Sequence, residues 1–471
     1  MFQRLWIAFL SLITVILPSF ALLGKESDRS IVTDEPTTKK GRPVGALEYV
    51  AKVAATDGQH LALTMHKLNS GFDPPRPFFI WAIGSSYTNM LGNGEFWKQE
   101  IPKRFPKIAA VRYEKMVGNS CPWQYLQGWA RHLIVPDQPD LVLIYTLGEP
   151  SDLEKLIVEI RTQTTADIIV PSIHWRAVDE GMWGNSENSP QQDVAAIRAI
   201  CQKHQVEFVD NRRDWGEYLK ANNLPINALL KDAVHQSDYG AHIINTNIFA
   251  HFQTKAPSNF DPTARERRIL VNANADGILK ATITGTRVDI DAEKSPDGGR
   301  YRVLIDGKPG NEVNAFLMSY VQPDPKNVKE GKGANPRDQS PHGITLGKNV
   351  LPQSWTIMMT NDSGEYELTG SVTGTDGNGN AFQSFTSNSG QIEINPNLWR
   401  RAEKNRTGDR FTFEVRRGVS EEINLTGEKS RVTIRLAQAL ANGSHTVELI
   451  PFAPGATRTV TFQVYQPAIE P

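Results

Sequence analysis

The stretch Phe78-Phe79-Ile80-Trp81-Ala82-Ile83-Gly84-Ser85-Ser86 decides the fold of this chain. The residues up to Ile83 are all apolar, as in a strand that is buried on both faces of a parallel sheet. The apolar run ends abruptly at Gly84 and two serines follow. Open α/β sheets place their chemistry at the carboxyl ends of their strands, so we expect a serine hydroxyl at that edge.

Apolar runs of strand length alternate with helical patterns over residues 46–257. The expected strands are Phe78–Ile83, Ile108–Tyr113, Leu141–Leu147, Ile168–Ile173 and Val206–Val209. The expected helices are Ala46–Leu68, Glu95–Arg104, Trp123–Leu133, Leu153–Thr162, Pro190–His204, Asp214–Asn222 and Tyr239–Phe252. Strands that alternate with helices predict crossover connections and therefore a three-layer α/β/α domain with a parallel five-stranded sheet.

Short alternating runs replace the helical patterns after residue 260. Such runs, separated by Gly, Asn and Asp turns, predict an all-β sandwich or jelly roll over residues 262–468. Its early strands around Val288 and Ile305 are too short to form a sheet alone, so we expect them to need the late strands around Val447 and Val464. The region is therefore predicted to be one module, with a long loop at 322–347.

The first 21 residues have the pattern of a secretory signal peptide. Arg4 precedes the apolar run from Leu5 to Leu17, and Ser19-Phe20-Ala21 fits a cleavage site. An uncleaved anchor helix is the alternative. Residues 22–45 are predicted to be a flexible leader. We expect a secreted or periplasmic protein without stable membrane insertion after cleavage.

Composition excludes several classes of function. With 51 basic and 52 acidic residues, the chain has no overall field for nucleic acid, so no nucleic-acid partner is expected. Its two cysteines, Cys121 and Cys201, are too few for a disulfide framework, and whether they pair is left open; Cys201 fits a small buried side chain. The scattered histidines show no spacing typical of metal ligands, so no metal site is expected.

A second motif, Asp232-Ala233-Val234-His235, lies just before the last predicted helix. Alone, such a motif is often a helix cap beside a surface histidine. Together with the serines after Ile83 it supplies a nucleophile, a base and an orienting carboxylate, which is the minimum set for acyl transfer through serine. The combination predicts a serine hydrolase.

At these residues the chain resembles the GDSL/SGNH hydrolase superfamily of esterases, over roughly residues 75–256. The first family block, Gly-Asp-Ser, corresponds to Gly84-Ser85-Ser86, with Ser85 in place of the aspartate. The resemblance implies the flavodoxin-like SGNH fold, with Ser86 as nucleophile, His235 as base and Asp232 as its partner.

The same resemblance implies an oxyanion hole, whose donors depart from the family pattern. Gly118 matches the glycine after the second strand, so the backbone N–H groups of Ser86 and Gly118 are expected donors. The family's Gly-x-Asn-Asp block is replaced by Gly148-Glu149-Pro150-Ser151-Asp152. Ser151 would occupy the position of the missing amide, and Asn119 is the alternative donor.

His174, Trp175 and Arg176 follow the fourth predicted strand, at the edge where such sheets bind ligands. They are candidate substrate-binding residues, with a packed aromatic loop as the equal alternative. The β region resembles the accessory modules of carbohydrate-active enzymes. We therefore expect an exported esterase that removes acetyl or another small acyl group from a polysaccharide, with no metal or organic cofactor. The alternatives are an O-acyltransferase acting on an extracellular glycan, and a non-catalytic glycan-binding protein.

Overall fold

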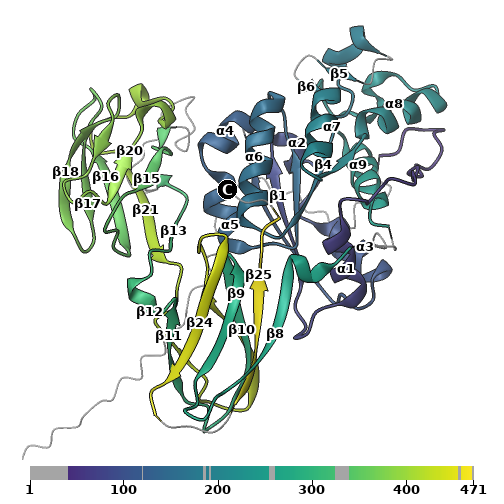
Figure 1. The fold of residues 1–471 in the computed structure, drawn as a ribbon. Helices are drawn as coiled ribbons and strands as arrows, with labels where there is room; N and C mark the ends of the chain where they lie inside the picture. The colour runs from purple at the N-terminus through teal and green to yellow at the C-terminus, as the bar shows by residue number, and fades with distance from the viewer. Residues whose placement is uncertain are drawn as a thin grey trace, which may run out of the picture. The chain divides into compact units, whose positions relative to one another are not determined.

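The computed structural model describes residues 41–118, 120–183, 187–189, 192–253, 260–323, 339–453 and 458–468. Five parallel strands form the sheet of the α/β part (Figure 1), and their order is β2-β1-β3-β4-β7. They are β1 (Phe78–Gly84), β2 (Val111–Val117), β3 (Leu141–Tyr145), β4 (Asp167–Pro171) and β7 (Glu207–Val209). This is the flavodoxin-like strand order. The predicted parallel five-stranded sheet is confirmed.

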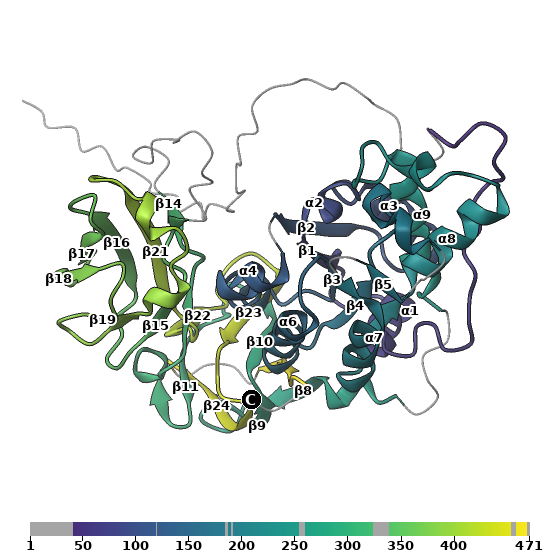
Figure 2. The ribbon, with the colours of Figure 1, turned by 90° about the horizontal axis from the view of Figure 1, so that it is seen from above.

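The side chains of β1 alternate between two hydrophobic cores, one on each face of the sheet. Phe78, Ile80 and Ala82 join one cluster, whereas Phe79, Trp81 and Ile83 join the other. Helices cover both faces, with α3, α8 and α9 on one side and α4, α6 and α7 on the other (Figure 2). The helices are α1 (Ala62–Ser70), α2 (Ser86–Asn89), α3 (Glu95–Arg104), α4 (Cys121–Leu126), α5 (Val135–Asp137), α6 (Pro150–Gln163), α7 (Val194–Lys203), α8 (Asn211–Ala221) and α9 (Asp238–Ala250). The predicted three-layer arrangement is confirmed.

Two predicted helices differ from the structure. The pattern over Ala46–Leu68 gives a helix only from Ala62; Ala46 and Tyr49 are buried three residues apart in a segment without regular structure. Gly58 has φ +82°, and a Cβ there would lie 2.3 Å from the carbonyl oxygen of His251, so the chain passes closely over α9's end instead of coiling. Trp123–Leu133 is likewise not one helix. Gly128, at φ +70°, ends it, and a π-helical turn, Ala130–Ile134, follows.

The β region begins and ends in one pair of sheets around a common hydrophobic cluster. One sheet has the order β23-β10-β25-β8, and the other contains β12-β11-β24-β9 with β22 paired to β11. Val288 faces Val464 and Ile305 faces Val447, which confirms the predicted pairing of early with late strands. The strands are β8 (Glu266–Asn272), β9 (Leu279–Gly285), β10 (Arg287–Lys294), β11 (Arg300–Ile305), β12 (Lys308–Pro309), β22 (Glu422–Asn424), β23 (Ser430–Ala437), β24 (Gly443–Pro451) and β25 (Thr459–Tyr465).

Residues between β12 and β22 form a second β unit with its own hydrophobic cluster, centred on Trp355, Tyr366 and Phe411. Its strands are β13 (Phe316–Met318), β14 (Gln322–Pro323), β15 (Ile344–Leu346), β16 (Gln353–Met359), β17 (Glu365–Gly370), β18 (Gly374–Asn380), β19 (Phe385–Thr386), β20 (Ile392–Ile394) and β21 (Arg410–Arg417). The region predicted as a single module thus contains two hydrophobic cores, because strands β13 to β21 pack their apolar side chains around a cluster of their own. Most of the predicted loop 322–347 lies outside the described residues, and its end forms β15.

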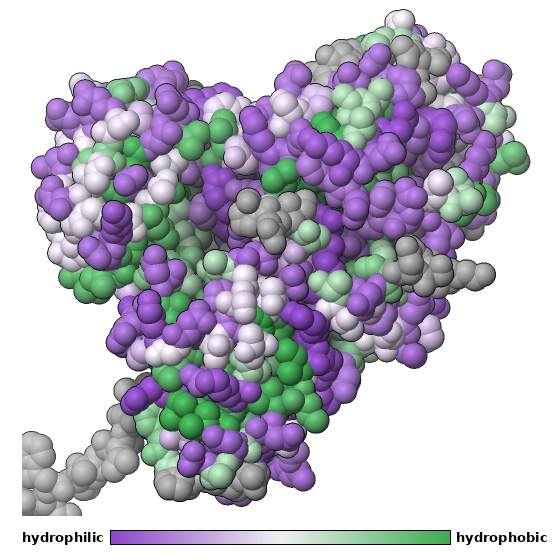
Figure 3. Space-filling view, in the orientation of Figure 1, coloured by the Kyte–Doolittle hydropathy of each residue, from purple (hydrophilic) through white to green (hydrophobic). Residues whose placement is uncertain are grey.

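Polar contacts join the α/β part to the β region. Glu266 of β8 accepts hydrogen bonds from Lys67 at 2.7 Å and from Thr165 at 2.6 Å. Gln438 donates to the carbonyl of Val135 at 2.8 Å. Figure 3 shows a largely hydrophilic face, with hydrophobic residues gathered low in the view, over β24 and β10 of the β region. The domain boundaries stay predictions.

The predicted signal peptide 1–21 and leader residues 22–40 lie outside the described residues. Across the described ranges, none of the helices combines the length and apolar character that crossing a bilayer requires.

Cys121 and Cys201 are both buried and unpaired, which settles the open question of a disulfide between them. Burial raises the pKa of each thiol to about 12.

Candidate active site

Ser86 is presented by a tight turn between β1 and α2. At Gly84 an added Cβ would lie 2.1 Å from the carbonyl oxygen of Tyr145, so only glycine lets β1 pass this close to β3. Ser85 is the N-cap of α2, and its Oγ accepts a hydrogen bond from the N–H of Tyr87 at 3.3 Å. Ser86 is exposed although Ser85, Tyr87 and Thr88 are buried. The turn therefore holds one serine hydroxyl out at the carboxyl edge of the sheet.

His235 lies between Ser86 and Asp232. Its Nε2 is 2.8 Å from the Oγ of Ser86, and its Nδ1 is 2.8 Å from Oδ2 of Asp232. The backbone N–H of His235 and that of Val234 donate to Oδ1 of Asp232 at 2.8 and 2.9 Å. These bonds hold the pKa of Asp232 well below its usual range, so it is a carboxylate. Because a carboxylate only accepts, Nδ1 of His235 carries the proton and Nε2 is left to accept from the serine.

The turn that carries Asp232 and His235 is closed by backbone hydrogen bonds. The N–H of Lys231 donates to the carbonyl of His235 at 3.0 Å, and the N–H of Ser237 donates to that of Leu229 at 2.8 Å. Ser237 is the N-cap of α9, with its Oγ accepting from Gly240. Asp232 is therefore not the helix cap that the alternative interpretation of this motif required. The structure brings together all three predicted residues of the serine, histidine and aspartate set.

The predicted oxyanion donors are placed less favourably. The N–H of Gly118 donates to the carbonyl of Gly84 at 2.9 Å, as a continuation of the sheet. The prediction that this N–H is an oxyanion donor is therefore corrected, because its hydrogen bond to Gly84 leaves it unavailable to a substrate. Ser151 is an exposed residue in the first turn of α6. Asn119 lies outside the described residues. The N–H of Ser86 is in the first turn of α2, where a helix has no internal acceptor for it, and so it is the best-placed donor.

His174, Trp175 and Arg176 are buried, with exposed fractions of 0%, 2% and 1%. The prediction that they contact substrate is therefore corrected, because side chains this enclosed present no surface to a ligand. They form the packed loop that was the alternative interpretation.

Sequence reasoning missed Asp179, which organises this loop. Its carboxylate accepts from Arg176 at 2.8 Å and from Arg212 at 2.9 Å, and the guanidinium of Arg212 lies 3.6 Å from the centre of the Trp175 ring. Nothing in the local pattern around Asp179 distinguishes it from a surface acid.

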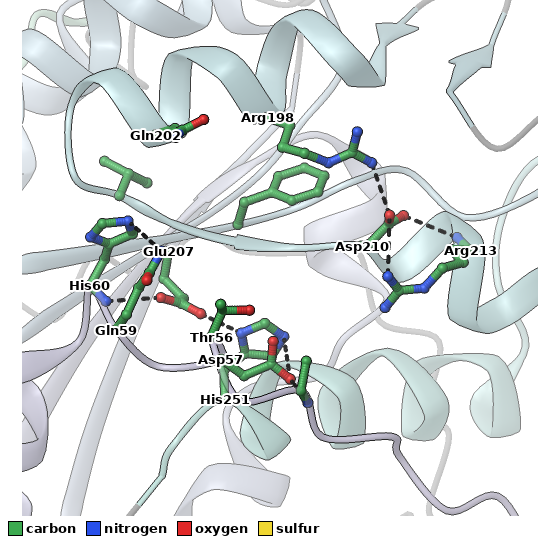
Figure 4. A pocket seen from close by; sticks show the side chains of 13 residues that line it. Thr56, Asp57, Gln59, His60, Arg198, Gln202, Glu207, Asp210, Arg213 and His251 are labelled. Carbon is green, nitrogen blue, oxygen red and sulfur yellow. Dashed lines mark hydrogen bonds and ion pairs between the residues drawn. The ribbon is translucent and has the colours of Figure 1, made fainter. Parts of the chain in front are cut away.

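A cavity of about 300 Å³ lies apart from this set (Figure 4). Segment 54–60, α7, β7, the start of α8 and His251 line it. Its charged groups face one another: Asp210 lies 2.9 Å from Arg198 and 3.7 Å from Arg213, and Glu207 pairs with His251. Neither Ser86 nor His235 lines it, so the candidate active site is the open surface around Ser86. In the described part of the chain, no group of three or more His, Cys, Asp or Glu side chains could hold a metal ion.

Fold and site together define an α/β/α domain that carries a hydrogen-bonded serine, histidine and aspartate at the carboxyl edge of a parallel sheet. No protein-family model and no curated protein matches the chain. Among solved structures, Axe2, an acetylxylan esterase from Geobacillus stearothermophilus, is similar over 38% of this chain and 97% of its own, with 18% identity and a TM-score of 0.31. A two-domain esterase active on acetylated mannans is similar over 87% of this chain and 95% of its own, with 10% identity and a TM-score of 0.31. Both are esterases, the class that the sequence resemblance indicates, but similarity at this level assigns no activity to this chain.

Proposed function

We propose that this protein is a serine esterase that removes acetyl or another small acyl group from a polysaccharide. One observation carries the proposal: His235 is 2.8 Å from both the Ser86 hydroxyl and the Asp232 carboxylate. A general base within hydrogen-bonding reach of a nucleophile, and itself oriented by a third group, is the geometry of nucleophilic acyl transfer.

The geometry supports a two-step reaction. His235 removes the proton from Ser86 as its Oγ attacks the ester carbonyl, and the Asp232 carboxylate stabilises the imidazolium that forms. His235 then gives this proton to the sugar oxygen that leaves, and the acyl group remains on Ser86. Water attacks the acyl-enzyme with His235 as base, which releases the carboxylic acid and restores the serine. In this proposed mechanism the N–H of Ser86 stabilises the charge that develops on the carbonyl oxygen.

The openness of the site supports a polymeric substrate. Ser86 is exposed, and the side chains of His235 and Asp232 are 26% and 46% exposed. Small-molecule ligands are usually enclosed in concave pockets, whereas a side group on a long chain needs a site that the chain can cross. The predicted signal peptide supports the further proposal that the protein acts in the periplasm or outside the cell, where such polymers occur. The β region supports a role in glycan binding only through its resemblance to accessory modules.

The test begins with the purified protein on a chromogenic acetate ester, followed by a panel of acetylated polysaccharides with released acetate as the measurement. A fluorophosphonate probe should label the wild-type protein at Ser86 and leave Ser86→Ala unlabelled. Turnover that rises when a glycan hydroxyl replaces water as acceptor would indicate the O-acyltransferase instead. Binding of glycan with neither turnover nor labelling would show a non-catalytic protein and overturn the proposal.

A further inference from the structure

The buried loop after β4 holds the turn that carries His235. The N–H of Ala177 donates to the carbonyl of Ala233 at 2.9 Å. The Nε2 of His174 lies 3.0 Å from the carbonyl oxygen of Val234, the residue just before His235. Two consecutive carbonyls of the turn are thus bonded to the loop from Ser172 to Ala177, although some 60 residues separate His174 from Val234 in sequence.

The partners of His174 determine which of its nitrogens carries the proton. A carbonyl oxygen only accepts, so Nε2 must be the protonated nitrogen and Nδ1 the acceptor. The hydroxyl of Tyr145, at the end of β3, lies 2.6 Å from Nδ1 and must therefore donate. Burial raises the pKa of Tyr145, which keeps this hydroxyl protonated.

The surroundings of His174 keep its ring neutral. Burial, helped by the nearby guanidinium groups of Arg176 and Arg212, lowers the pKa of His174 to about 3, against the opposing effects of the Val234 carbonyl and Asp179. His174 therefore serves as a donor to Val234 without changing its charge in the physiological range.

The peptide unit between Val234 and His235 is hydrogen-bonded at both ends. The carbonyl of Val234 and the N–H of His235 belong to the same planar group. His174 binds the carbonyl end at 3.0 Å, and Oδ1 of Asp232 binds the N–H end at 2.8 Å. The ring of Tyr87 also contacts both histidines edge to face, with ring centres 5.1 Å from His174 and 5.6 Å from His235. The orientation of the His235 backbone is thus fixed from both sides.

We propose that Tyr145 and His174 form a hydrogen-bonded relay that positions His235 for proton transfer to and from Ser86. His174 is in this sense a positioning residue, and the inference rests on the proposed function of Ser86. Without the relay, the peptide before His235 can rotate, and Nε2 no longer lies within 2.8 Å of the serine hydroxyl. A displacement of about 1 Å at a reacting group can cost about a hundredfold in rate.

Four variants test the relay. His174→Leu removes the donor to Val234, whereas His174→Gln keeps an amide N–H near the position of Nε2. Tyr145→Phe removes only the hydroxyl that fixes the protonation of His174. His132→Leu is the matched control, because His132 is partly buried, also bonds a backbone carbonyl, that of Met318 at 3.1 Å, and also has its pKa lowered to about 3 by burial.

On the acetate ester, we expect His174→Leu to lower kcat by about a hundredfold with KM changed less than about twofold. His174→Gln should recover most of that loss, and Tyr145→Phe should lie between the two. The rate of fluorophosphonate labelling should follow kcat. His132→Leu should lower thermal stability by a similar amount while leaving kcat per folded molecule unchanged. If His174→Leu loses no more kcat than His132→Leu, the relay does not exist, although the assignment of Ser86 stands.

A spectroscopic measurement separates failure of the relay from failure of the proposed function. Nitrogen NMR of the wild-type imidazoles should show His174 as the neutral Nε2–H form. The Nδ1–H proton signal of His235, bonded to Asp232, should broaden or vanish in His174→Leu and persist in His132→Leu. This holds whether or not the protein turns over an ester. An unchanged His235 signal in His174→Leu would overturn the inference.

Discussion

The two edges of the α/β sheet use charged and polar residues in opposite ways. At the carboxyl edge, Ser86, His235 and Asp232 are hydrogen-bonded to one another but remain open to solvent. At the amino edge, Asp140, which directly precedes β3, is buried and lies 2.9 Å from Lys67 and 2.6 Å from Arg76. Exposed polar groups can reach a substrate, whereas buried ones must satisfy each other. The chemistry proposed above would lie at the carboxyl edge, whereas at the amino edge Lys67 also pairs with Glu266 of the β region at 2.7 Å.

The largest effect should follow from changes at the carboxyl edge. Ser86→Ala and His235→Ala should each lower kcat by about 10⁴- to 10⁶-fold, because nucleophile and base act as a unit. Thermal unfolding should be nearly unchanged, since both side chains are at the surface. The measurement is turnover of the acetate ester with melting temperature as control. If Ser86→Ala retained activity, the carboxyl edge would lose its assigned role.

Asp232→Asn should lower kcat by about 10³- to 10⁴-fold, somewhat less than loss of the base. The amide keeps an oxygen for the N–H groups of Val234 and His235 but no longer selects the protonated Nδ1 of His235. Steady-state kinetics should show the loss in kcat with little change in KM. A KM effect alone would make Asp232 a substrate contact.

At the amino edge the effect should be on stability instead. Burial alone would raise the pKa of Asp140, but the charges of Lys67 and Arg76 hold it well below its usual range. Asp140→Asn leaves Lys67, whose side chain is 7% exposed, without one of its carboxylates. Removing one partner of a buried pair costs about 3–5 kcal/mol of unfolding free energy. Denaturant unfolding measures this, and kcat per folded molecule should be unchanged.

Acid should lower the free energy of unfolding through histidines whose pKa is lowered by burial. The pKa of His132 is lowered by burial from 6.5 to about 3. Between these pH values His132 is protonated in the unfolded chain but neutral in the folded chain. The free energy of unfolding therefore falls as pH decreases from 6.5 towards 3. Melting temperature against pH should show this decline, and a smaller decline in His132→Asn, whose amide can still donate to Met318. An equal decline in both would assign the acid sensitivity to other groups.

The difference between the two edges also explains what the sequence could predict. The five parallel strands could be predicted from their apolar runs, and Ser86 from its place directly after one of these runs. Asp232 and His235 could be predicted from their spacing before the last helix, but their grouping with Ser86 and the strand order needed the family resemblance and the structure. Burial of His174 depends on Tyr145 and Val234, which are distant in sequence, and a histidine after a strand has the same local pattern whether it faces solvent or the interior. The apolar spacing of segment 46–61 predicts a helix, but the segment is irregular. The prediction is wrong because a chain that packs along a surface without coiling can also bury a residue at every third position.

The smallest change in kcat should come from substitution of Ser151. This variant tests how far the active surface extends along the carboxyl edge of the sheet. If Ser151 replaced the amide of the family's Gly-x-Asn-Asp block, Ser151→Ala would remove an oxyanion donor and cost about 10²- to 10³-fold in kcat. In the structure this residue is exposed in the first turn of α6, directly after Pro150. We therefore expect less than about a twofold change in kcat, as for an exposed side chain outside the reacting set. Asp152→Ala is the matched control, because Asp152 neighbours it in the same turn and pairs with Lys155 at 2.8 Å. A hundredfold loss in Ser151→Ala alone would show that the start of α6 moves towards Ser86 during the reaction, and the active surface would then extend along this edge to the end of β3.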